Sequence, residues 1–427
     1  QDVFSGGSAT STTINSGGGQ AVYSGGSATS TTINGGWQYV YNSGSATSTT
    51  INSGGRQHVS GGGSATSTTI NGGQQYVSSG GSATSTTING GGQTVSSGGS
   101  ATSTTINSGG GQAVYSGGSA TSTTINDGWQ NVYNSGSATS TTINGGGQAV
   151  FSGASATSTT INGGQQIVSS GGSATSTTIN SGGQQIVSSG GSATSTTINS
   201  GGGQSVYNSG SATSTTINGG WQNVSHDGSA TSTTINDGWQ NVYNSGSATS
   251  TTINSGGGQD VFSGGSATST TINDGQQIVS SGGSATSTTI NSGGQQHVSG
   301  GGSATSTTIN SGGWQAVYSG GSATSTTINS DGQQNVFSGG SATSTTINSG
   351  GQQNVSSGGS ATSTTINDGW QNVYNSGSAT STTINGGLQA VYSGGSATST
   401  TINNGWQNVY NSGSATSTTI NGGLQAV

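Results

Sequence analysis

The chain has 427 residues, of which 86 are glycine, and it contains no proline, cysteine or methionine. Its formal charge is −7, because eight aspartates are opposed by a single basic residue, Arg56. A chain so poor in cations cannot neutralise phosphates, which excludes a nucleic-acid-binding protein, and no stretch is apolar enough to span a bilayer. The sequence starts in mid-repeat at Gln1 without a signal peptide, so we expect a fragment or a processed product.

One octapeptide, SATSTTIN, dominates the sequence. It first occurs at Ser8 and returns, unchanged, to a total of 23 copies that begin 18 or 19 residues apart. A fixed period of this size is typical of a solenoid, in which each repeat forms one coil. The one-residue difference always falls in the Gly-rich stretch between the final Asn and the next Gln, which indicates a surface turn. The low hydrophobic content of 25% would suit disorder, but Ala9, Ile14 and Val22 recur in phase, which a disordered linker does not require.

The residue pattern of each repeat predicts three short strands. The abundance of Gly and of β-branched Thr, Ile and Val excludes a helix. With Ile and Val facing inward, Thr12 shares the inner face with Ile14, and Gln20 shares it with Val22. The predicted strands of the first repeat are Ser8–Thr10, Thr12–Ile14 and Gln20–Tyr23, with corners near Ser11, at Asn15–Gly18 and at Ser24–Gly26. Asn-Gly and Gly-Gly pairs are expected to supply the positive φ that such corners need.

A single coil of this kind cannot fold alone, because one Ile and one Val cannot offset the entropy of ordering a whole repeat. Main-chain pairing with the coils above and below must supply the difference, which places identical residues in columns. The inward Gln column then needs amide pairing, since a buried unpaired amide is costly. We therefore predict an all-β parallel β-helix of about 23 coils over residues 1–427. The unequal spacing of the apolar positions favours a right-handed solenoid over a left-handed hexapeptide helix.

The sequence offers no convincing catalytic, metal or cofactor site. Ser225, His226 and Asp227 resemble a triad written in a row, but adjacent residues rarely reach triad geometry, and a polar loop explains them. His58 and His297 occupy the same outward position 239 residues apart, so they cannot share a metal. The Gly-rich calcium-binding pattern of β-solenoids is absent, and no Lys follows the Gly-rich runs, so they are not phosphate loops. We predict that the protein is not an enzyme.

The outward positions around Gln-x-Val vary, unlike the octapeptide. All seven Trp stand directly before Gln, and all four Phe and ten of the twelve Tyr stand directly after Val. One hypothesis is an aromatic stripe that binds sugar or a partner cell; the alternative is that the rings merely cover and stiffen a thin strand face. The candidate adhesive aromatics are Trp37, Tyr39, Tyr41, Trp129, Tyr133, Trp239, Tyr243, Trp370, Tyr374, Trp406 and Tyr410.

The invariant side of the repeat suggests a different role. A modifying enzyme that recognises a local shape needs the same acceptor presented repeatedly, and two columns of serine satisfy this; the alternative is that these serines are small, soluble ladder residues. One column lies in the Ser-Gly-Gly or Asn-Ser-Gly corner, and its candidates are Ser5, Ser24, Ser43, Ser79, Ser97, Ser116 and Ser135. The other lies within the octapeptide, and its candidates are Ser11, Ser30 and Ser48.

The pattern Gly-Gly-x-Ala-x-x-Thr-x-Ile-Asn-x-Gly-Gly-x-Gln-x-Val, which covers essentially the whole chain, closely resembles the repeats of self-associating autotransporter adhesins of Gram-negative bacteria, the AIDA-type, TibA and antigen-43-like proteins. The resemblance implies a secreted, right-handed β-helical passenger displayed at the outer membrane by a C-terminal barrel, which this sequence lacks. It also implies autoaggregation, adhesion to a host-cell receptor and biofilm formation. Finally, it implies that a cytoplasmic heptosyltransferase attaches heptose to Ser before export.

Two other functions remain open at this point. Regular outward columns of Ser11 and Thr13 on a flat solenoid face could match an ice lattice, as in ice-binding β-solenoids. An inert rigid surface stalk would also need nothing more than the repeats. Thermal hysteresis and bacterial aggregation assays separate the three functions.

Overall fold

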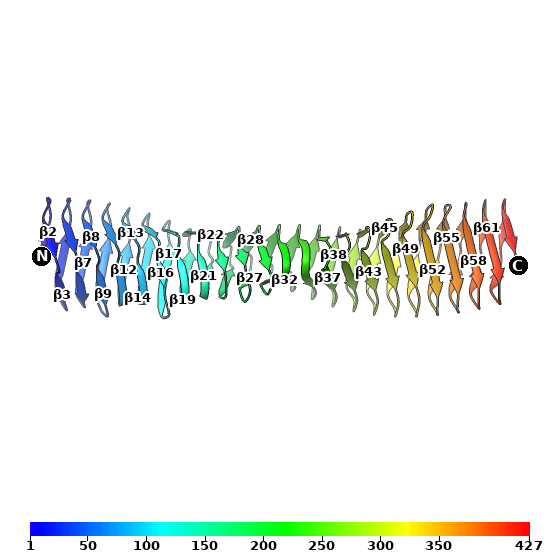
Figure 1. The fold of residues 1–427 in the computed structure, drawn as a ribbon, viewed down its shortest axis with the longest axis horizontal. Helices are drawn as coiled ribbons and strands as arrows, with labels where there is room; N and C mark the ends of the chain where they lie inside the picture. The colour runs from blue at the N-terminus through cyan, green and yellow to red at the C-terminus, as the bar shows by residue number, and fades with distance from the viewer. The chain divides into compact units, whose positions relative to one another are not determined.

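The computed structural model describes all residues, 1–427, and consists of strands without a helix. The chain forms two compact units, Gln1–Thr215 and Thr216–Val427. Within each unit the strands stack as a parallel β-solenoid, coil beside coil (Figure 1). The predicted all-β solenoid is therefore confirmed. No helix is present that could cross a membrane.

The first coil shows how a repeat is divided. It contains β2 (Ser8–Thr10), β3 (Thr13–Asn15) and β4 (Gly19–Val22), and the next coil begins with β5 (Ser27–Thr29). The three predicted strands thus agree with the observed ones to within one residue at each end. Later coils repeat this division, as in β53 (Ser360–Thr362), β54 (Thr365–Ile366) and β55 (Trp370–Tyr374).

Where the Gly-rich corner is one residue shorter, the second and third strands can run on as one. The merged strands are β12 (Thr69–Val77), β14 (Thr87–Ser96), β19 (Thr124–Tyr133), β21 (Thr142–Val150), β32 (Thr216–Val224) and β34 (Thr234–Val242). The variation in repeat length is therefore absorbed at this corner, as the sequence predicts, and the remaining positions stay in register.

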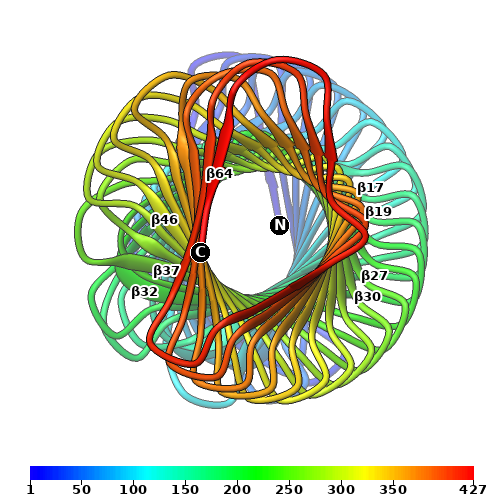
Figure 2. The same cartoon turned by 90° about the vertical axis from the view of Figure 1, so that its right-hand side faces the viewer.

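Neighbouring coils within a unit pair in parallel with equivalent residues opposite each other. Ser8–Thr10 lies opposite Ser27–Thr29, and Thr13–Asn15 lies opposite Thr32–Asn34. This register places every repeated residue in a column, with steps of about 4.8 Å between coils. Figure 2 shows the stack of the second unit end-on, with its last coil, which ends at β64 (Leu424–Ala426), nearest the viewer. The corner loops project outwards from the strands.

The corners use serine as well as glycine in the left-handed region. In the first octapeptide Ser11 has φ of 56°, and in the next corner Ser24 and Gly25 have φ of 48° and 77°. The sequence-based expectation that Gly and Asn-Gly pairs supply these angles was therefore incomplete. A left-handed conformation costs an ordinary L-residue roughly 1–2 kcal/mol, so the serines are held there by the stacked coils.

One glycine per coil is required by close approach. A Cβ added to Gly26 would collide with the carbonyl group of Val3 in the preceding coil. Ala154 occupies the equivalent position in one coil, and there the turn hydrogen bond from its N–H to the Phe151 carbonyl is 3.2 Å long, against 2.9 Å from Gly26 to Tyr23. A methyl group is thus tolerated only with a loosened turn.

The apolar interior consists of three columns. Ala28, Ile33 and Val40, and their equivalents in the other interior coils, are 0–1% exposed. Valine and alanine columns pack together in continuous clusters, such as the cluster that extends from Val95 to Ala156. The inward assignment of Ala, Ile and Val made from the sequence is confirmed.

A polar ladder runs beside these columns inside the protein. Gln38 is fully buried, and its Nε2 donates to Gln20 Oε1 at 2.7 Å and to Thr31 Oγ1 at 3.3 Å. Its Oε1 accepts from Gln57 at 2.7 Å and from Thr49 at 3.4 Å. Both hydrogens and both oxygen lone pairs of the Gln38 side-chain amide are therefore hydrogen-bonded, which is the amide pairing that the sequence requires.

A second amide ladder lies on the outer surface. Asn52 Nδ2 donates to Asn34 Oδ1 at 2.8 Å, and Asn107 Nδ2 donates to Asn89 Oδ1 at 2.8 Å. Both ladders point in one direction, because the amide nitrogen of each coil donates to the amide oxygen of the preceding coil. The two ladders share this direction, but the outer one is exposed to water and less regular, with an Asn71–Asn52 bond of 3.5 Å.

Candidate adhesive and modification surfaces

Both candidate serine columns lie on the solvent-facing corners. The ten serines named above are all exposed, and all have φ between 48° and 63°. In the Ser-Gly-Gly corner the following glycine also projects freely, since a Cβ at Gly25 would have no atom within 4 Å. Each hydroxyl therefore sits at the tip of a short loop between two short strands, where an enzyme can reach it.

The octapeptide corner also bears on the ice-binding alternative. Ser11 is a left-handed corner residue outside the strands, whereas Thr13 begins β3. The two residues therefore do not form two columns on one flat strand face. The geometry that an ice lattice would match is absent from this side of the coil.

Five of the seven tryptophans in the slot before Gln are exposed, whereas Trp221 and Trp314 are partly buried. Trp37, Trp129 and Trp239 are 38–41% exposed, and Trp370 and Trp406 are 50% and 56% exposed. Some of these indoles cover a neighbouring glycine: a Cβ at Gly19 would collide with the Trp37 ring, and one at Gly258 would lie 2.6 Å from the Trp239 ring. Part of the Trp37 and Trp239 indoles therefore covers the strand, as the alternative proposes, while the rest of each ring faces solvent.

Rings in the slot after Val form short stacks along the axis. Tyr374, Tyr392 and Tyr410 stack with centroid distances of 5.2 Å and interplanar angles of 5° and 8°. The candidate residues Tyr41, Tyr133 and Tyr243 stack in the same way with a Tyr or Phe of a neighbouring coil. These three tyrosines and Tyr374 are half-buried by their neighbours, so they present ring edges to solvent. Tyr410, and Tyr39 in the slot between Gln and Val, are exposed.

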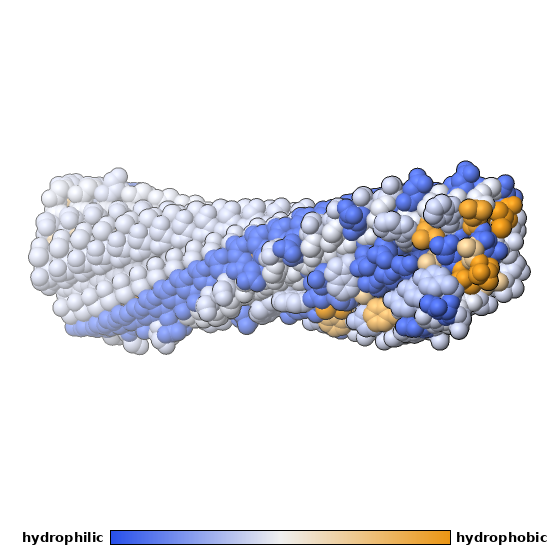
Figure 3. Space-filling model, turned by 45° about the vertical axis from the view of Figure 1, so that its right-hand side comes forward, coloured by the Kyte–Doolittle hydropathy of each residue, from blue (hydrophilic) through white to orange (hydrophobic).

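Two shallow grooves follow the Trp slot in the second unit. Trp370, Leu388 and Trp406 lie in register, and with Gly387 and Gly405 they line a groove of about 330 Å³. Hydrophobic surface gathers at this end of the second unit in Figure 3. A contiguous apolar surface framed by two indoles can hold the apolar face of a ligand.

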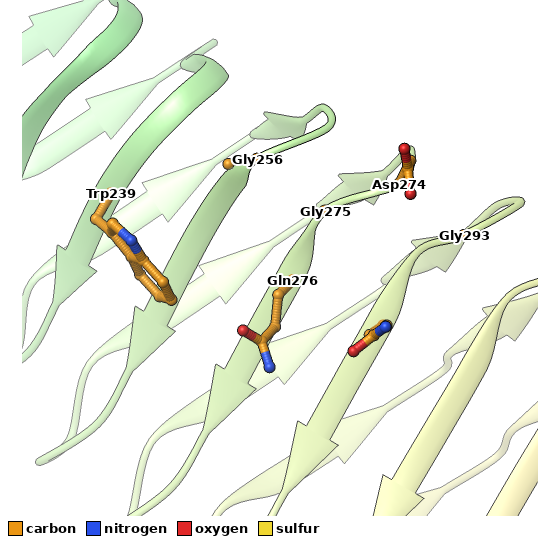
Figure 4. Close-up of a pocket in the computed structure, with 8 residues that line it drawn as sticks. Trp239, Gly256, Asp274, Gly275, Gln276 and Gly293 are labelled. Carbon is orange, nitrogen blue, oxygen red and sulfur yellow. The ribbon is translucent and has the colours of Figure 1, made fainter. Parts of the chain in front are cut away.

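The other groove, of about 270 Å³, lies between Trp239 and Gln276. Gly258 lies in register between them, and because it has no side chain the Trp239 indole can lie across it. Figure 4 shows Trp239 and Gln276 on either side of the strand that follows Gly256, with Asp274 at the corner above. This groove is lined mainly by glycine and polar side chains, unlike the apolar groove at Trp370.

The triad-like run does not form a catalytic arrangement. Ser225 is 7% exposed, and His226 Nδ1 lies 3.1 Å from its Oγ. His226 and Asp227 both lie in the left-handed corner, with φ of 46° and 61°, and no hydrogen bond joins their side chains. The Ser225 hydroxyl is covered and contacts only the neighbouring corner residue, which agrees with the polar-loop interpretation.

The histidines in the variable slot are packed against aromatic rings. His58 stacks between Tyr39 and Tyr76, at 4.8 Å from each ring centroid. Burial and, to a smaller extent, the nearby Arg56 guanidinium lower the pKa of His58 below its usual range. His297 contacts Trp314 edge-on, and burial lowers its pKa as well. No group of three or more His, Cys, Asp or Glu is placed to hold a metal ion.

Comparisons with known proteins identify related chains. A model of the family described as "adhesin of bacterial autotransporter system, probable stalk" matches residues 70–110, 143–183, 179–220, 253–294 and 294–351, which together make up about half of the chain. Among solved structures, the chain is similar to a TibA fragment, residues 55–350, hyper-glycosylated by TibC catalysis. The two share 41% sequence identity over 84% of this chain and 94% of that chain, with a TM-score of 0.26. No curated protein matches.

Proposed function

Because the chain belongs to the family of bacterial autotransporter adhesin stalks, we propose that residues 1–427 serve as one repetitive passenger domain that promotes contact between cells. Its partners would be copies of the same protein on other cells and a receptor on a host cell. The family supports exposure on the surface of a Gram-negative bacterium. We assign the domain no catalytic role, since the one triad-like run is folded into a polar corner.

We further propose that the serine columns carry O-linked sugar. The observation that carries this proposal is that every candidate serine is exposed at a left-handed corner. Glycine and asparagine adopt that conformation at lower cost than serine. A corner selected for stability alone would therefore use them, so the recurrence of serine favours a role for the hydroxyl.

The comparison bears on the enzyme that would attach the sugar. The TibA fragment, 41% identical to this chain, is hyper-glycosylated by TibC catalysis, which supports a related glycosyltransferase as a partner here. We propose a heptosyltransferase that acts in the cytoplasm before export. Because the same corner recurs in each coil, one enzyme that recognises this local shape can modify many sites.

The test compares the two columns directly. One variant replaces Ser79, Ser97 and Ser116 by Asn, and the matched variant replaces Ser85, Ser103 and Ser122 by Asn; all six residues have φ of 48–58°, and Asn tolerates that region. Protein from the native host should lose up to three sugar masses in one variant and none in the other, because one corner is the acceptor. Intact mass spectrometry with and without the transferase measures this.

Cell clumping then separates sugar from aromatic contacts. If sugar carries adhesion, cells without the transferase should not clump, while a variant with all seven Trp changed to Gly should clump normally. If the exposed indoles carry adhesion, the two results should be reversed. An unmodified wild-type mass in the native host would refute the modification, and a lack of clumping by every form would refute the adhesive function.

A further inference from the structure

The only basic residue of the chain occupies an unusual surface. Arg56 begins β10 (Arg56–Val59) in the slot before Gln, in register between Trp37 of β7 (Trp37–Val40) and Gln74 of β12. Its side chain is exposed, and its guanidinium has neither an ion pair nor a hydrogen bond within the chain. Five N–H donors in a planar fork therefore face solvent.

An aromatic track runs beside this cation. The ring centroids of Trp37 and Tyr39 lie 4.8 Å apart, with an angle of 53° between the ring planes. The rings of Tyr39, His58 and Tyr76 continue the track, with 4.8 Å between successive ring centroids. Trp37 and Tyr39 are 39% and 41% exposed. No other stack combines exposed rings with a cation, because Arg56 is the only one in the sequence.

The nearest carboxylates in the stack are too far away to cancel this charge. Asp2 precedes Arg56 by three coils and Asp127 follows it by four, which corresponds to about 14 Å and 19 Å at about 4.8 Å per coil. Both distances exceed the Debye length of about 8 Å at physiological ionic strength. The patch therefore remains locally positive on a molecule whose net charge is −7.

We propose that Arg56, Trp37 and Tyr39, with the Gln74 amide beside them, form a binding site for a carboxylated sugar within an acidic glycan. The planar guanidinium matches a carboxylate with two parallel hydrogen bonds. The exposed parts of the rings offer an apolar body with a polar edge, which suits the C–H face of a pyranose and its hydroxyls. This inference names a ligand for the proposed adhesive surface and rests on that function.

The single charge determines the ligand class. A nucleic acid or a polysulfated chain needs several cations in a row to bind, and this surface has one. A sugar that carries isolated carboxylates on a largely neutral, hydroxylated body fits this surface better, because one carboxylate can pair with Arg56 while the uncharged rest of the sugar lies on the rings.

The test uses the whole chain and a hyaluronan tetrasaccharide, with its carboxyl methyl ester as the neutral probe. In low salt, calorimetric titration should show the acid binding about tenfold more tightly than the ester, as expected for a charge-assisted hydrogen bond at an exposed site. Arg56→Gln should remove this difference without altering the fold, because Gln already fills the slot at Gln74. Trp37→Gly should weaken both probes, and Gly fills that slot at Gly19.

A matched control separates charge from site. Arg56→Gln combined with Gln184→Arg keeps the net charge and places the cation in the same slot of β27 (Gln184–Ser188), where the facing slots hold Gln165 and Gly203 and the middle slot holds Ile186. This double variant should bind the acid no more tightly than the ester. Equal binding of acid and ester by the wild type, tighter binding of the acid than of the ester by the double variant, or equal competition by inorganic phosphate or an acidic peptide would overturn the site.

Cell assays distinguish the failure of this site from that of the proposed function. If cells that display the wild-type protein clump while the purified chain ignores the tetrasaccharide, only the Arg56 site is refuted. If such cells neither clump nor adhere, the adhesive function itself is refuted. Selective loss of adhesion to glucuronate-coated surfaces in Arg56→Gln cells, with clumping retained, would support both.

Discussion

At the scale of single residues, Asp260 is the one side chain that conflicts with its surroundings. It lies in the variable slot of β37 (Gly257–Val261), with Asn241 opposite in the preceding coil and Ile278 in the next. Its Oδ1 is buried without a hydrogen-bond partner, and burial raises its pKa. Asn241 Nδ2 donates to Asn223 Oδ1 at 2.8 Å, so a donor at position 260 would continue this short ladder.

Asp260→Asn should therefore stabilise the second unit by about 1 kcal/mol at pH 7, the usual net contribution of one hydrogen bond. Because the folded pKa of Asp260 is raised, its ionised form costs stability above the ordinary carboxyl pKa of 3.8, and acid relieves that cost. The advantage of Asn should thus shrink as the pH falls toward that value. Denaturant unfolding at both pH values measures this.

The matched change Asp331→Asn, at an exposed left-handed corner, should alter stability by less than about 0.5 kcal/mol. An Asp260→Asn protein no more stable than wild type at pH 7 would show that the isolated carboxylate is already satisfied by solvent.

At the scale of elements, the inner and outer amide ladders provide a direct comparison of buried and exposed hydrogen bonds. Gln130 donates to Gln112 Oε1 at 2.6 Å and accepts from Gln148 at 2.6 Å inside the protein. Asn107 makes the equivalent bonds at 2.8 Å and 3.0 Å on the surface. Water can replace the lost partner only at the surface.

Gln130→Leu should destabilise the first unit by about 2–6 kcal/mol, since it removes four buried hydrogen bonds, two to glutamines and two to threonines of the ladder, at about 0.5–1.5 kcal/mol each. Asn107→Ala should cost less than about 1 kcal/mol. Hydrogen exchange of the flanking strands and denaturant unfolding report both effects. Similar losses from the two variants would mean that water enters the inner ladder.

The elements were largely predictable because each rests on a repeated pattern. The strands, the inward Gln20 and the outward Trp37 all follow from strand alternation and the fixed period. The left-handed serines were not predicted, because serine alone prefers other conformations and only the stacked coils impose this one. The Tyr39–His58–Tyr76 track and the strain at Asp260 also escaped prediction, since they depend on what the same slot holds in the next coil.

At the scale of the whole molecule, the near absence of charge sets the response to solution conditions. No ion pair links the coils, and Arg56 is the only side chain of the chain that is permanently cationic. Apolar columns and hydrogen-bonded ladders hold each unit, and neither depends on screened attraction. Stability should therefore be unusually insensitive to salt in the range where surface ion pairs weaken.

Titration of His58 and His297 should give the main response of stability between pH 8 and pH 5. His58 and His297 have lowered pKa values in the folded chain, so the unfolded chain binds more protons below its ordinary histidine value of 6.5. Stability should therefore be constant above that pH, fall as the pH drops from 6.5 toward the lowered folded values, and level off below them. Melting temperature across this range measures the effect.

Replacing His58 by Tyr and His297 by Ala should flatten this profile, and both substitutes already occur in that slot, at Tyr39 and Ala316. A pH dependence that persists in the double variant would assign it to another group.

The one-way direction of the amide ladders affects how the chain assembles. Each completed coil offers its successor a finished template of oxygen acceptors, much as a crystal face receives the next layer. Because the octapeptides are identical, that template cannot tell the next repeat from the one after it, and skipping a repeat would cost little beyond a looped-out segment. The correct order of the coils must then come from the order in time in which the repeats become available to the growing end of the solenoid. The timing of folding thus supplies information that identical repeats do not carry.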